Sequence, residues 1–158
     1  MVFGCVGLLV ILADQISKTW IRANLDIGQS LFDVGFFQVV HVYNTGAAFG
    51  IFKDQSLTLT IVAFIGIIVI LLIVFFLHSR WPFLDSLLVR AAIGLLLGGT
   101  VGNLIDRLRF GYVTDFIDIG IWPTFNIADS AITVGVIIFA YSLLRLTRAK
   151  KHQDEQSI

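Results

Sequence analysis

The sequence contains few of the residues on which soluble and secreted folds rely. Of its 158 residues, two are proline, one is cysteine and only 14% are charged, compared with about 25% in an ordinary soluble domain. The single cysteine, Cys5, excludes a disulfide framework and a cysteine-based zinc site. Because 11 basic and 11 acidic residues balance, no overall field attracts nucleic acid. Disulfide-rich modules and nucleic-acid-binding proteins are therefore excluded.

Apolar side chains, in contrast, are in excess. Hydrophobic residues make up 57% of the chain, and 14 residues are phenylalanine. A soluble domain of this size could not bury so much apolar surface, and long Ile, Leu and Val runs are the opposite of the signature of disorder. The composition therefore predicts one membrane domain that occupies residues 1–158.

Several apolar segments are long enough to cross a bilayer, which takes about 20 residues in a helix. The stretch 57–77 contains no charged residue and is the clearest span. Three further candidates lie at about 2–22, 86–106 and 127–146. The predicted class is a mainly α membrane protein with four transmembrane helices, an outer β-rich loop at 23–56 and a disordered tail at about 150–158.

The basic residues predict the orientation of these helices. Those that decide it lie in the tail and in the connector between the second and third spans: Arg80, Arg90, Arg145, Arg148, Lys150 and Lys151. We expect this side to be cytoplasmic, and with four spans both termini lie on it. The N-terminus lacks the basic region of a signal peptide, and Cys5 lies too near Met1 to follow a lipoprotein leader. The first segment is therefore interpreted as a helix.

Residues that favour β-structure concentrate in the two outer connections. The run 36–43 is rich in aromatic and β-branched residues, and glycines precede it at positions 28 and 35. A second extended run lies at 112–117, and Pro123 follows it before the fourth span. We expect these runs to form a small sheet at the outer membrane surface.

Polar residues inside the spans are candidates for a site, because charged groups near the hydrocarbon are costly. Asp14 and Lys18 are four residues apart and share a helix face, as do Asn103 and Arg107. A structural ion pair is the alternative for the first pair, and an interfacial anchor is the alternative for Arg107. Asn103 lies one turn deeper in the span, which favours a site.

Glycines repeat on one face of the third span. Gly94, Gly98 and Gly102 are spaced by four residues, and Gly99 lies beside them. Such a face lets another backbone approach closely. We interpret these glycines as helix-packing residues.

Two carboxylates are predicted to converge at the outer edge of the membrane. Asp129 lies with Asn126 at the start of the fourth span, and Asp115 lies in the extended run that returns to the same edge. Two close carboxylates in a partly desolvated site share a proton. One can then act as general base on a water, while the protonated one polarises a scissile carbonyl. A helix cap is the alternative for Asp129.

Other chemistries fit the sequence less well. The serines lie outside any G-x-S-x-G turn, and the sequence has no H-E-x-x-H motif. The acidic residues could bind a hard cation, but they show no regular ligand spacing. A proton-coupled carrier is a rival interpretation of membrane carboxylates, although no inverted repeat is visible. A non-catalytic assembly subunit is a second rival.

Five short segments follow one another along the chain: Asp14-Gln15-Ile16-Ser17-Lys18, Asn44-Thr45-Gly46-Ala47-Ala48-Phe49-Gly50, Gly99-Thr100-Val101-Gly102-Asn103-Leu104-Ile105-Asp106-Arg107, Val113-Thr114-Asp115-Phe116 and Phe125-Asn126-Ile127-Ala128-Asp129. Together, and in this order, they resemble the bacterial lipoprotein signal peptidases, also called signal peptidase II. Each segment alone is a weak signal, but their order on a chain with four spans is specific.

The resemblance implies an intramembrane aspartic endopeptidase of the cytoplasmic (inner) membrane, with its site near the outer face. Its substrate would be a diacylglyceryl-modified prolipoprotein, cut just before the lipidated cysteine. Asp115 and Asp129 would be the catalytic pair. The resemblance and the polar positions together imply that these residues shape the site: Asp14, Lys18, Asn44, Gly46, Asn103, Arg107 and Asn126. The resemblance also implies an outer sheet, a mobile loop over the site within residues 23–56, no metal or other cofactor, and inhibition by globomycin. We expect a monomer in contact with membrane lipid.

Overall fold

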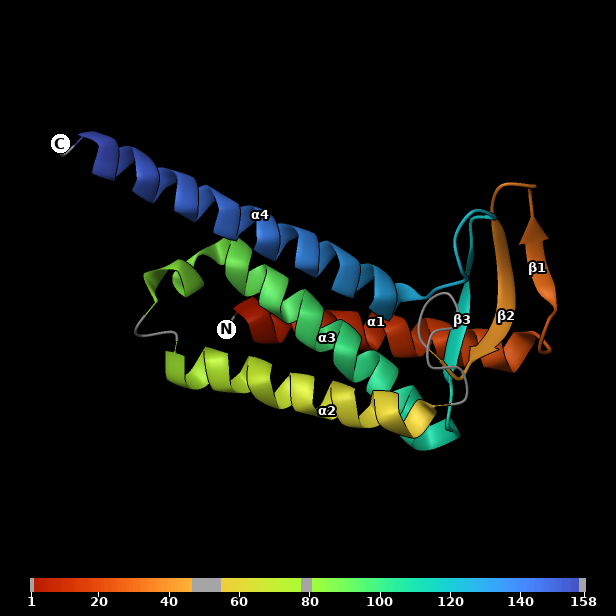
Figure 1. The fold of residues 1–158 in the computed structure, drawn as a ribbon. Coiled ribbons are helices and arrows are strands. Elements are labelled where there is room, and N and C mark those ends of the chain that lie inside the picture. The colour runs from red at the N-terminus through yellow and green to blue at the C-terminus, as the bar shows by residue number, and fades with distance from the viewer. Residues whose placement is uncertain (1, 47–54, 78–80, 157–158) are drawn as a thin grey trace.

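The computed structural model describes residues 2–46, 55–77 and 81–156. Within them the long helices lie side by side in one bundle, and a small sheet lies at one end of it (Figure 1). The helices are α1 (Val2–Asn24), α2 (Ser56–Leu72), α3 (Leu87–Phe110) and α4 (Ile127–Gln156). A π-helical turn, η2 (Ile73–Leu77), extends α2, and a 3-10 turn, η4 (Pro82–Asp85), precedes α3.

The described residues contain four helices that are long and apolar enough to cross a membrane, which confirms the predicted fold class. Their ends differ from the expected ones. Helix α3 continues past 106 to Phe110, where Gly111 ends it in a left-handed conformation (φ 79°) that glycine adopts without steric cost. The sequence predicts an end at about 106, where charged residues begin. The helix instead continues for one more turn, until the left-handed backbone of Gly111 ends it.

Helix α4 also runs further than predicted. It continues past 146 to Gln156, so residues 150–156 are helical where a disordered tail was expected. No glycine or proline follows Gly135 in this helix, and Arg, Lys, Gln and Glu are good helix formers. The turn-to-turn hydrogen bonds therefore continue beyond the apolar part of the helix.

Helix α3 is the centre of the bundle and contacts the three other long helices. Half of the residues in the most apolar part of α3 are buried inside the protein, whereas none of those in the corresponding part of α2 are. The predicted glycine face makes this position possible. A Cβ atom at Gly98 would lie 2.6 Å from the carbonyl oxygen of Gly7 in α1, and one at Gly99 would collide with the Ala128 carbonyl in α4. The backbones of α1 and α4 therefore approach α3 closely.

The sheet contains three antiparallel strands in the order β1-β2-β3, and it lies at the end of the bundle away from both termini (Figure 1). The strands are β1 (Ser30–Asp33), β2 (Gln38–Asn44) and β3 (Val113–Asp118). The expected sheet is thus present, although its second strand starts at Gln38 rather than at 36, because a turn that contains Gly35 (φ 85°) precedes it.

A small apolar cluster attaches the sheet to the helices. Ile21 of α1 and Leu25, which directly follows the helix, pack with Phe116 of β3. Phe116 directly follows Asp115. This apolar contact therefore holds β3 in a position where the Asp115 carboxylate faces the helix bundle. The mobile loop that the resemblance implies was placed within 23–56, of which residues 47–54 lie outside the described residues.

Candidate active site

A hollow of about 360 Å³ opens between the sheet and the ends of the helices. Its polar lining residues are Asn44, Gly46, Thr100, Asn103, Arg107, Asp115, Asp129 and Thr133. Its apolar lining includes residues of α2 and of the segment before α4: Leu59, Val62, Ala63, Trp122, Pro123 and Phe125. The hollow therefore places carboxylates beside an apolar wall.

Asp115 occupies the centre of β3 and is 1% exposed. One of its carboxylate oxygens accepts a hydrogen bond from the residue before α4, and the other accepts one from the last residue of β2. Asn126 Nδ2 donates to one oxygen at 2.7 Å, and Asn44 Nδ2 donates to the other at 2.9 Å. Burial and then the negative charge of Asp129 raise the pKa of Asp115 to about 7, against the lowering effect of the two amides. Asp115 therefore holds a proton more readily than an ordinary aspartic acid.

Asp129 lies in the first turn of α4 and serves as part of its cap. The Asp129 backbone N–H donates to Asn126 Oδ1 at 2.9 Å, and the Asn126 N–H donates back to Asp129 Oδ2 at 3.3 Å. This is a reciprocal capping arrangement. The other Asp129 oxygen accepts a hydrogen bond of 2.8 Å from Asn103 Nδ2. The alternative that Asp129 caps the helix is thus correct, and the same carboxylate also lines the hollow.

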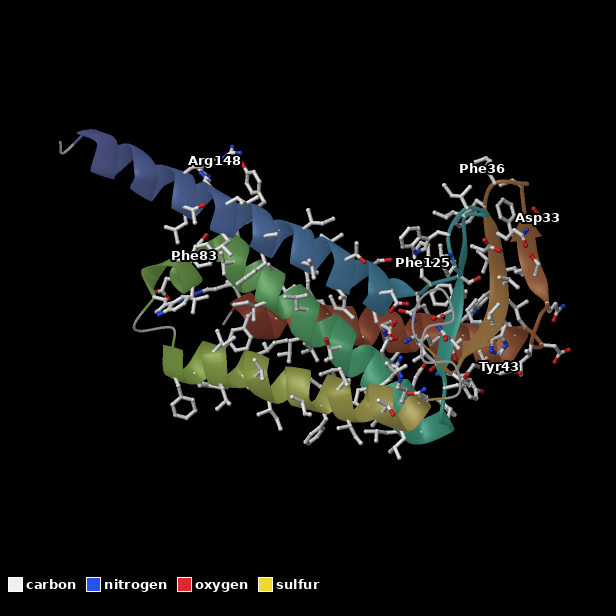
Figure 2. All side chains as sticks on the ribbon, viewed as in Figure 1. Asp33, Phe36, Tyr43, Phe83, Phe125 and Arg148 are labelled. Carbon is white, nitrogen blue, oxygen red and sulfur yellow. The ribbon has the colours of Figure 1, made fainter. Side chains whose placement is uncertain are left out.

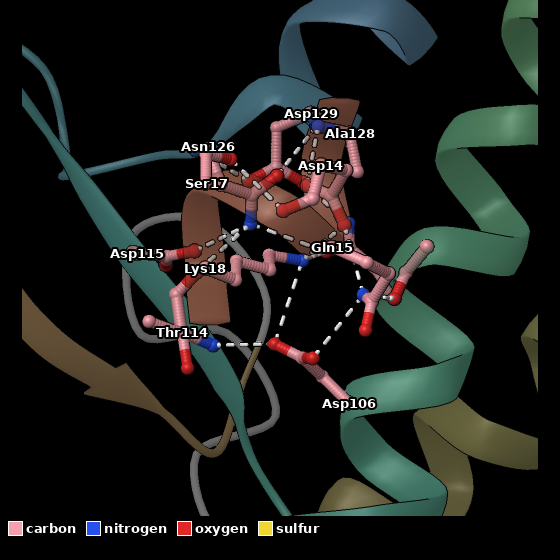
Figure 3. A network of polar contacts seen from close by, with 12 residues as sticks. Asp14, Gln15, Ser17, Lys18, Asp106, Thr114, Asp115, Asn126, Ala128 and Asp129 are labelled. Carbon is pink, nitrogen blue, oxygen red and sulfur yellow. Dashed lines mark hydrogen bonds and ion pairs between the residues drawn. The ribbon is translucent and has the colours of Figure 1, made fainter. Parts of the chain in front are cut away.

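Asn126 joins the two carboxylates. Its side chain is fully buried, and its Nδ2 donates both to Asp115 and to Asn103 Oδ1, the latter at 3.1 Å. Asn103 in turn donates to Asp129. Asp115 and Asp129, which are 14 positions apart in sequence, therefore converge on the side-chain amides of Asn126 and Asn103. Figure 3 shows Asn126 with Asp115 and Asp129.

Asp14 and Lys18 lie behind these amides and are both fully buried. Lys18 Nζ lies 2.9 Å from Asp14 Oδ2 and donates to Asn103 Oδ1 at 2.9 Å. Asp14 Oδ1 accepts the backbone N–H of Ala128 at 3.0 Å. The structural ion pair is therefore present, and it also orients Asn103 and the first turn of α4.

Arg107 and Gly46 meet at the side of the hollow. Arg107 Nη2 donates to the Gly46 carbonyl at 3.4 Å, and the Gly46 N–H donates to Asn44 Oδ1 at 2.9 Å. Asn44 thus uses its oxygen for its own turn and its nitrogen for Asp115. All the residues predicted for the site are brought together here, from α1, β2, α3, β3 and α4.

A second buried group was missed as part of the site. Asp106 is fully buried and accepts the Thr114 backbone N–H at 3.0 Å. Arg22 Nη1 lies 3.3 Å from Asp106 and donates to Thr114 Oγ1 at 2.9 Å, and its guanidinium lies 4.5 Å from the centre of the Phe110 ring. Thr114 directly precedes Asp115, so this group clamps β3 next to the carboxylate. The four-residue spacing of Asp14, Lys18 and Arg22 was the available signal.

Metal ligands are not gathered in this part of the protein. Within residues 2–46, 55–77 and 81–156, no three His, Cys, Asp or Glu side chains are close enough to hold a metal ion together.

Comparison with known proteins identifies the family of the chain. The family model described as Signal peptidase (SPase) II matches residues 6–145. The chain belongs to the signal peptidase II family. It is therefore a peptidase, as the sequence resemblance predicted.

Two relatives named lipoprotein signal peptidase show how far the similarity extends. One, from Dehalococcoides mccartyi, is 51% identical over 154 residues, which is 98% of this chain and 94% of the relative. Another, from Moorella thermoacetica, is 46% identical over 145 residues, 91% of this chain and 93% of the relative. A solved bacterial membrane enzyme structure superposes with a TM-score of 0.82 at 34% identity, over 92% of this chain and 89% of that one. The chain is thus a multi-pass membrane peptidase.

Proposed function

We propose that the chain removes the signal peptide from diacylglyceryl-modified prolipoproteins, cutting just before the lipidated cysteine, with a water activated by Asp115 and Asp129. The observation that carries this proposal is the convergence of both carboxylates on Asn126 beside one hollow. The name of the relatives, lipoprotein signal peptidase, supports the substrate class.

One of the two carboxylates acts as general base, and the other, protonated, acts as general acid. Because burial and the charge of Asp129 raise the pKa of Asp115 to about 7, the pair retains one proton near neutral pH. The ionised carboxylate takes a proton from water as the water oxygen attacks the scissile carbonyl carbon. The protonated carboxyl gives its proton to the carbonyl oxygen. The tetrahedral diol then collapses as its C–N bond breaks: the first carboxyl gives its proton to the leaving nitrogen, and the second carboxylate takes a proton back from one diol hydroxyl, which restores the starting state of the pair.

The amides and the buried ion pair keep this pair in place. Asn103 and Asn126 donate to the carboxylates, and Lys18 holds the Asn103 oxygen. Donors fixed before the reaction need no reorganisation when charge develops. Asp14, Lys18, Asn44, Gly46, Asn103, Arg107 and Asn126 are therefore proposed as positioning residues rather than as groups that react.

The surroundings of the hollow suit a substrate that arrives through lipid. Its apolar wall includes Val62 of α2, which is 60% exposed. A second hollow of about 360 Å³ shares Asp129, Trp122 and Phe125 with the first and continues toward Val134. An apolar signal helix and acyl chains could thus approach the carboxylates from the membrane. Globomycin, the inhibitor that the resemblance implies, is proposed to occupy the same hollow.

The distribution of basic residues supports one orientation. Arg90, Arg145 and Arg148 lie on α3 and α4 at the end where the chain terminates, and the sheet lies at the other end. By the positive-inside rule we propose the bacterial inner membrane, both termini in the cytoplasm and the site near the outer face. Since one chain supplies every site residue, we propose that it acts as a monomer.

Replacement of each aspartate tests the proposal. The purified chain, in detergent, is given a diacylglyceryl-modified precursor, and mass spectrometry identifies the product. Asp115→Asn and Asp129→Asn should each lose cleavage while they keep the fold. Asp118→Asn, on the same strand, is the matched control and should cleave normally, because Asp118 accepts only the Gly120 N–H in the described structure.

The same assay separates the proposal from its rivals. A non-catalytic subunit predicts that both variants keep full turnover, and this result would overturn the aspartic pair. Unlipidated precursor should be a poor substrate, since the acyl chains contribute binding free energy. Equal rates with both precursors would contradict the proposed substrate class.

A further inference from the structure

Another hollow lies at the end of the bundle opposite the sheet, between η4, the start of α3 and the later turns of α4. Its volume is about 270 Å³, and it is lined by Phe83, Ser86, Leu88, Tyr141, Ser142, Arg145 and Leu146. Figure 2 shows Phe83 and Arg148 at this end, away from Phe125 and Tyr43. The hollow therefore takes no part in the proposed active site.

Three polar side chains of this hollow have no partners among the described residues. The Arg145 guanidinium and the Ser86 and Tyr141 hydroxyls make no hydrogen bond or ion pair there. Ser86 begins α3 without a side-chain capping bond. Ser142 is different, since its hydroxyl donates to the Ile138 carbonyl at 2.8 Å. One cation and two hydroxyl donors are thus available to a ligand.

Among the described residues no acidic side chain lines the hollow, and none of them pairs with the positive charge of Arg145. The neighbouring Arg90 is different, because it pairs with Asp85. An anion is the complementary ligand, and a guanidinium can donate two parallel hydrogen bonds to a phosphate.

The apolar groups of the hollow lie on fixed elements at the boundary of the membrane. The α3 span begins at Leu87 and the α4 span ends at Arg148, so the hollow lies at the depth of lipid headgroups. Phe83 packs edge-to-face on Phe139, with ring centres 5.9 Å apart, and Leu84 of the same turn is buried. Leu88 is 44% exposed and continues the apolar surface toward the bilayer.

We propose that this hollow binds the phosphate of an anionic glycerophospholipid in the leaflet opposite the active site. Arg145 donates to the phosphate oxygens, and the Ser86 and Tyr141 hydroxyls donate to the remaining ones. Leu88 and Leu146 contact the glycerol and the first acyl carbons. Basic pockets between membrane helices are known to suit such headgroups. A zwitterionic lipid fits less well, because its ammonium group finds no carboxylate among the described residues of the lining.

Native mass spectrometry of the full chain in detergent tests the proposal. Phosphatidylglycerol and phosphatidylcholine with the same acyl chains are added, and bound lipid is counted. Wild-type protein should bind phosphatidylglycerol about tenfold more tightly than phosphatidylcholine, a difference typical of one added charge-assisted contact. Arg145→Gln should abolish this preference. Arg148→Gln removes the same charge from the same helix, outside the lining of the hollow, and should keep the preference.

A second variant and a soluble competitor complete the test. Leu88→Trp fills the hollow without a change of charge and should also lose the preference. Glycerol 3-phosphate should not displace the lipid at equal concentration, because it lacks acyl chains. Equal losses in Arg145→Gln and Arg148→Gln would show general attraction of charge and overturn the site. Full displacement by glycerol 3-phosphate would overturn the assignment to a lipid.

Discussion

The Asn126 side chain donates a hydrogen bond of 2.7 Å to the carboxylate of Asp115. The same residue caps the helix that carries Asp129, since its Oδ1 accepts the Asp129 N–H. One side chain therefore joins strand β3 to helix α4 at the point where their carboxylates meet. In the proposed mechanism, this amide holds the two carboxylates at their working distance.

Two substitutions of Asn126 separate capping from positioning. Asn126→Ser keeps an oxygen that can cap α4 but loses the donor to Asp115. We expect kcat to fall by about tenfold or more while KM changes little. Asn126→Ala loses the cap as well and should lower the free energy of unfolding by about 1 kcal/mol more. Equal kcat in wild-type protein and Asn126→Ser would contradict the positioning role.

The pH dependence of cleavage should report the pKa of Asp115. Because the pair must retain one proton, kcat/KM should fall as pH rises through about 7, the raised pKa of Asp115. The Asn44 amide lowers this pKa, so that Asn44→Ala should move the midpoint of the fall to higher pH. A shift to lower pH, or a profile without an alkaline limb, would contradict the assignment.

Stability should depend on pH through the same group. Between the ordinary value of 3.8 and about 7, the folded state binds a proton at Asp115 that the unfolded state releases. The free energy of unfolding should therefore decrease as pH rises from about 4 to 7 and then level off. Asp115→Asn does not titrate in this range, so its thermal midpoint should not fall between pH 4 and 7 as that of wild-type protein does. An equal fall in both proteins would count against the burial effect.

The Arg22 clamp predicts an energetic coupling across α1 and β3. Arg22→Met and Thr114→Val each remove the hydrogen bond between Arg22 Nη1 and Thr114 Oγ1. In a double-mutant cycle their effects on the free energy of unfolding should be non-additive by about 1 kcal/mol. Arg109→Met is the control, because Arg109 also lies over the Phe110 ring, at 5.3 Å, and should show additive effects with Thr114→Val.

The glycine face predicts a steric effect on stability. A side chain at Gly98 would meet the Gly7 backbone, which cannot move aside without separating α1 from α3. Gly98→Leu should therefore lower the free energy of unfolding by about 1–3 kcal/mol or more, the usual cost of overpacking. The thermal midpoint should fall accordingly. Gly66→Ala on α2 is the control, since nothing lies within 4 Å of a Cβ there, and it should leave the midpoint unchanged or raise it. An unchanged midpoint in Gly98→Leu would refute the close approach of the helices.

The membrane fold and most of the site residues could be predicted from the sequence because they depend on local properties. An apolar stretch long enough for the bilayer determines a span wherever its neighbours pack. The carboxylates and amides near the membrane, such as Asp14, Asn103 and Asp129, stand out because burial of polar groups is costly. The membrane orientation and the catalytic roles are also based on the sequence, and they stay predictions.

Only the tertiary structure decided how these groups contact one another. The sequence separation of Asp115 and Asp129 does not predict that Asn126 bridges them. The hydrogen bond from Asn126 to Asp115 forms only because Phe116 packs β3 against α1. Arg22, Asp106 and Thr114 come from three elements, and their network exists because the α3 glycines allow the helices to pack closely. Hydropathy is a property of one continuous segment, whereas these hydrogen bonds and close contacts join segments that are far apart in the sequence. The sequence by itself therefore determined which segments enter the membrane, and the packing of α3 decided which polar groups meet there.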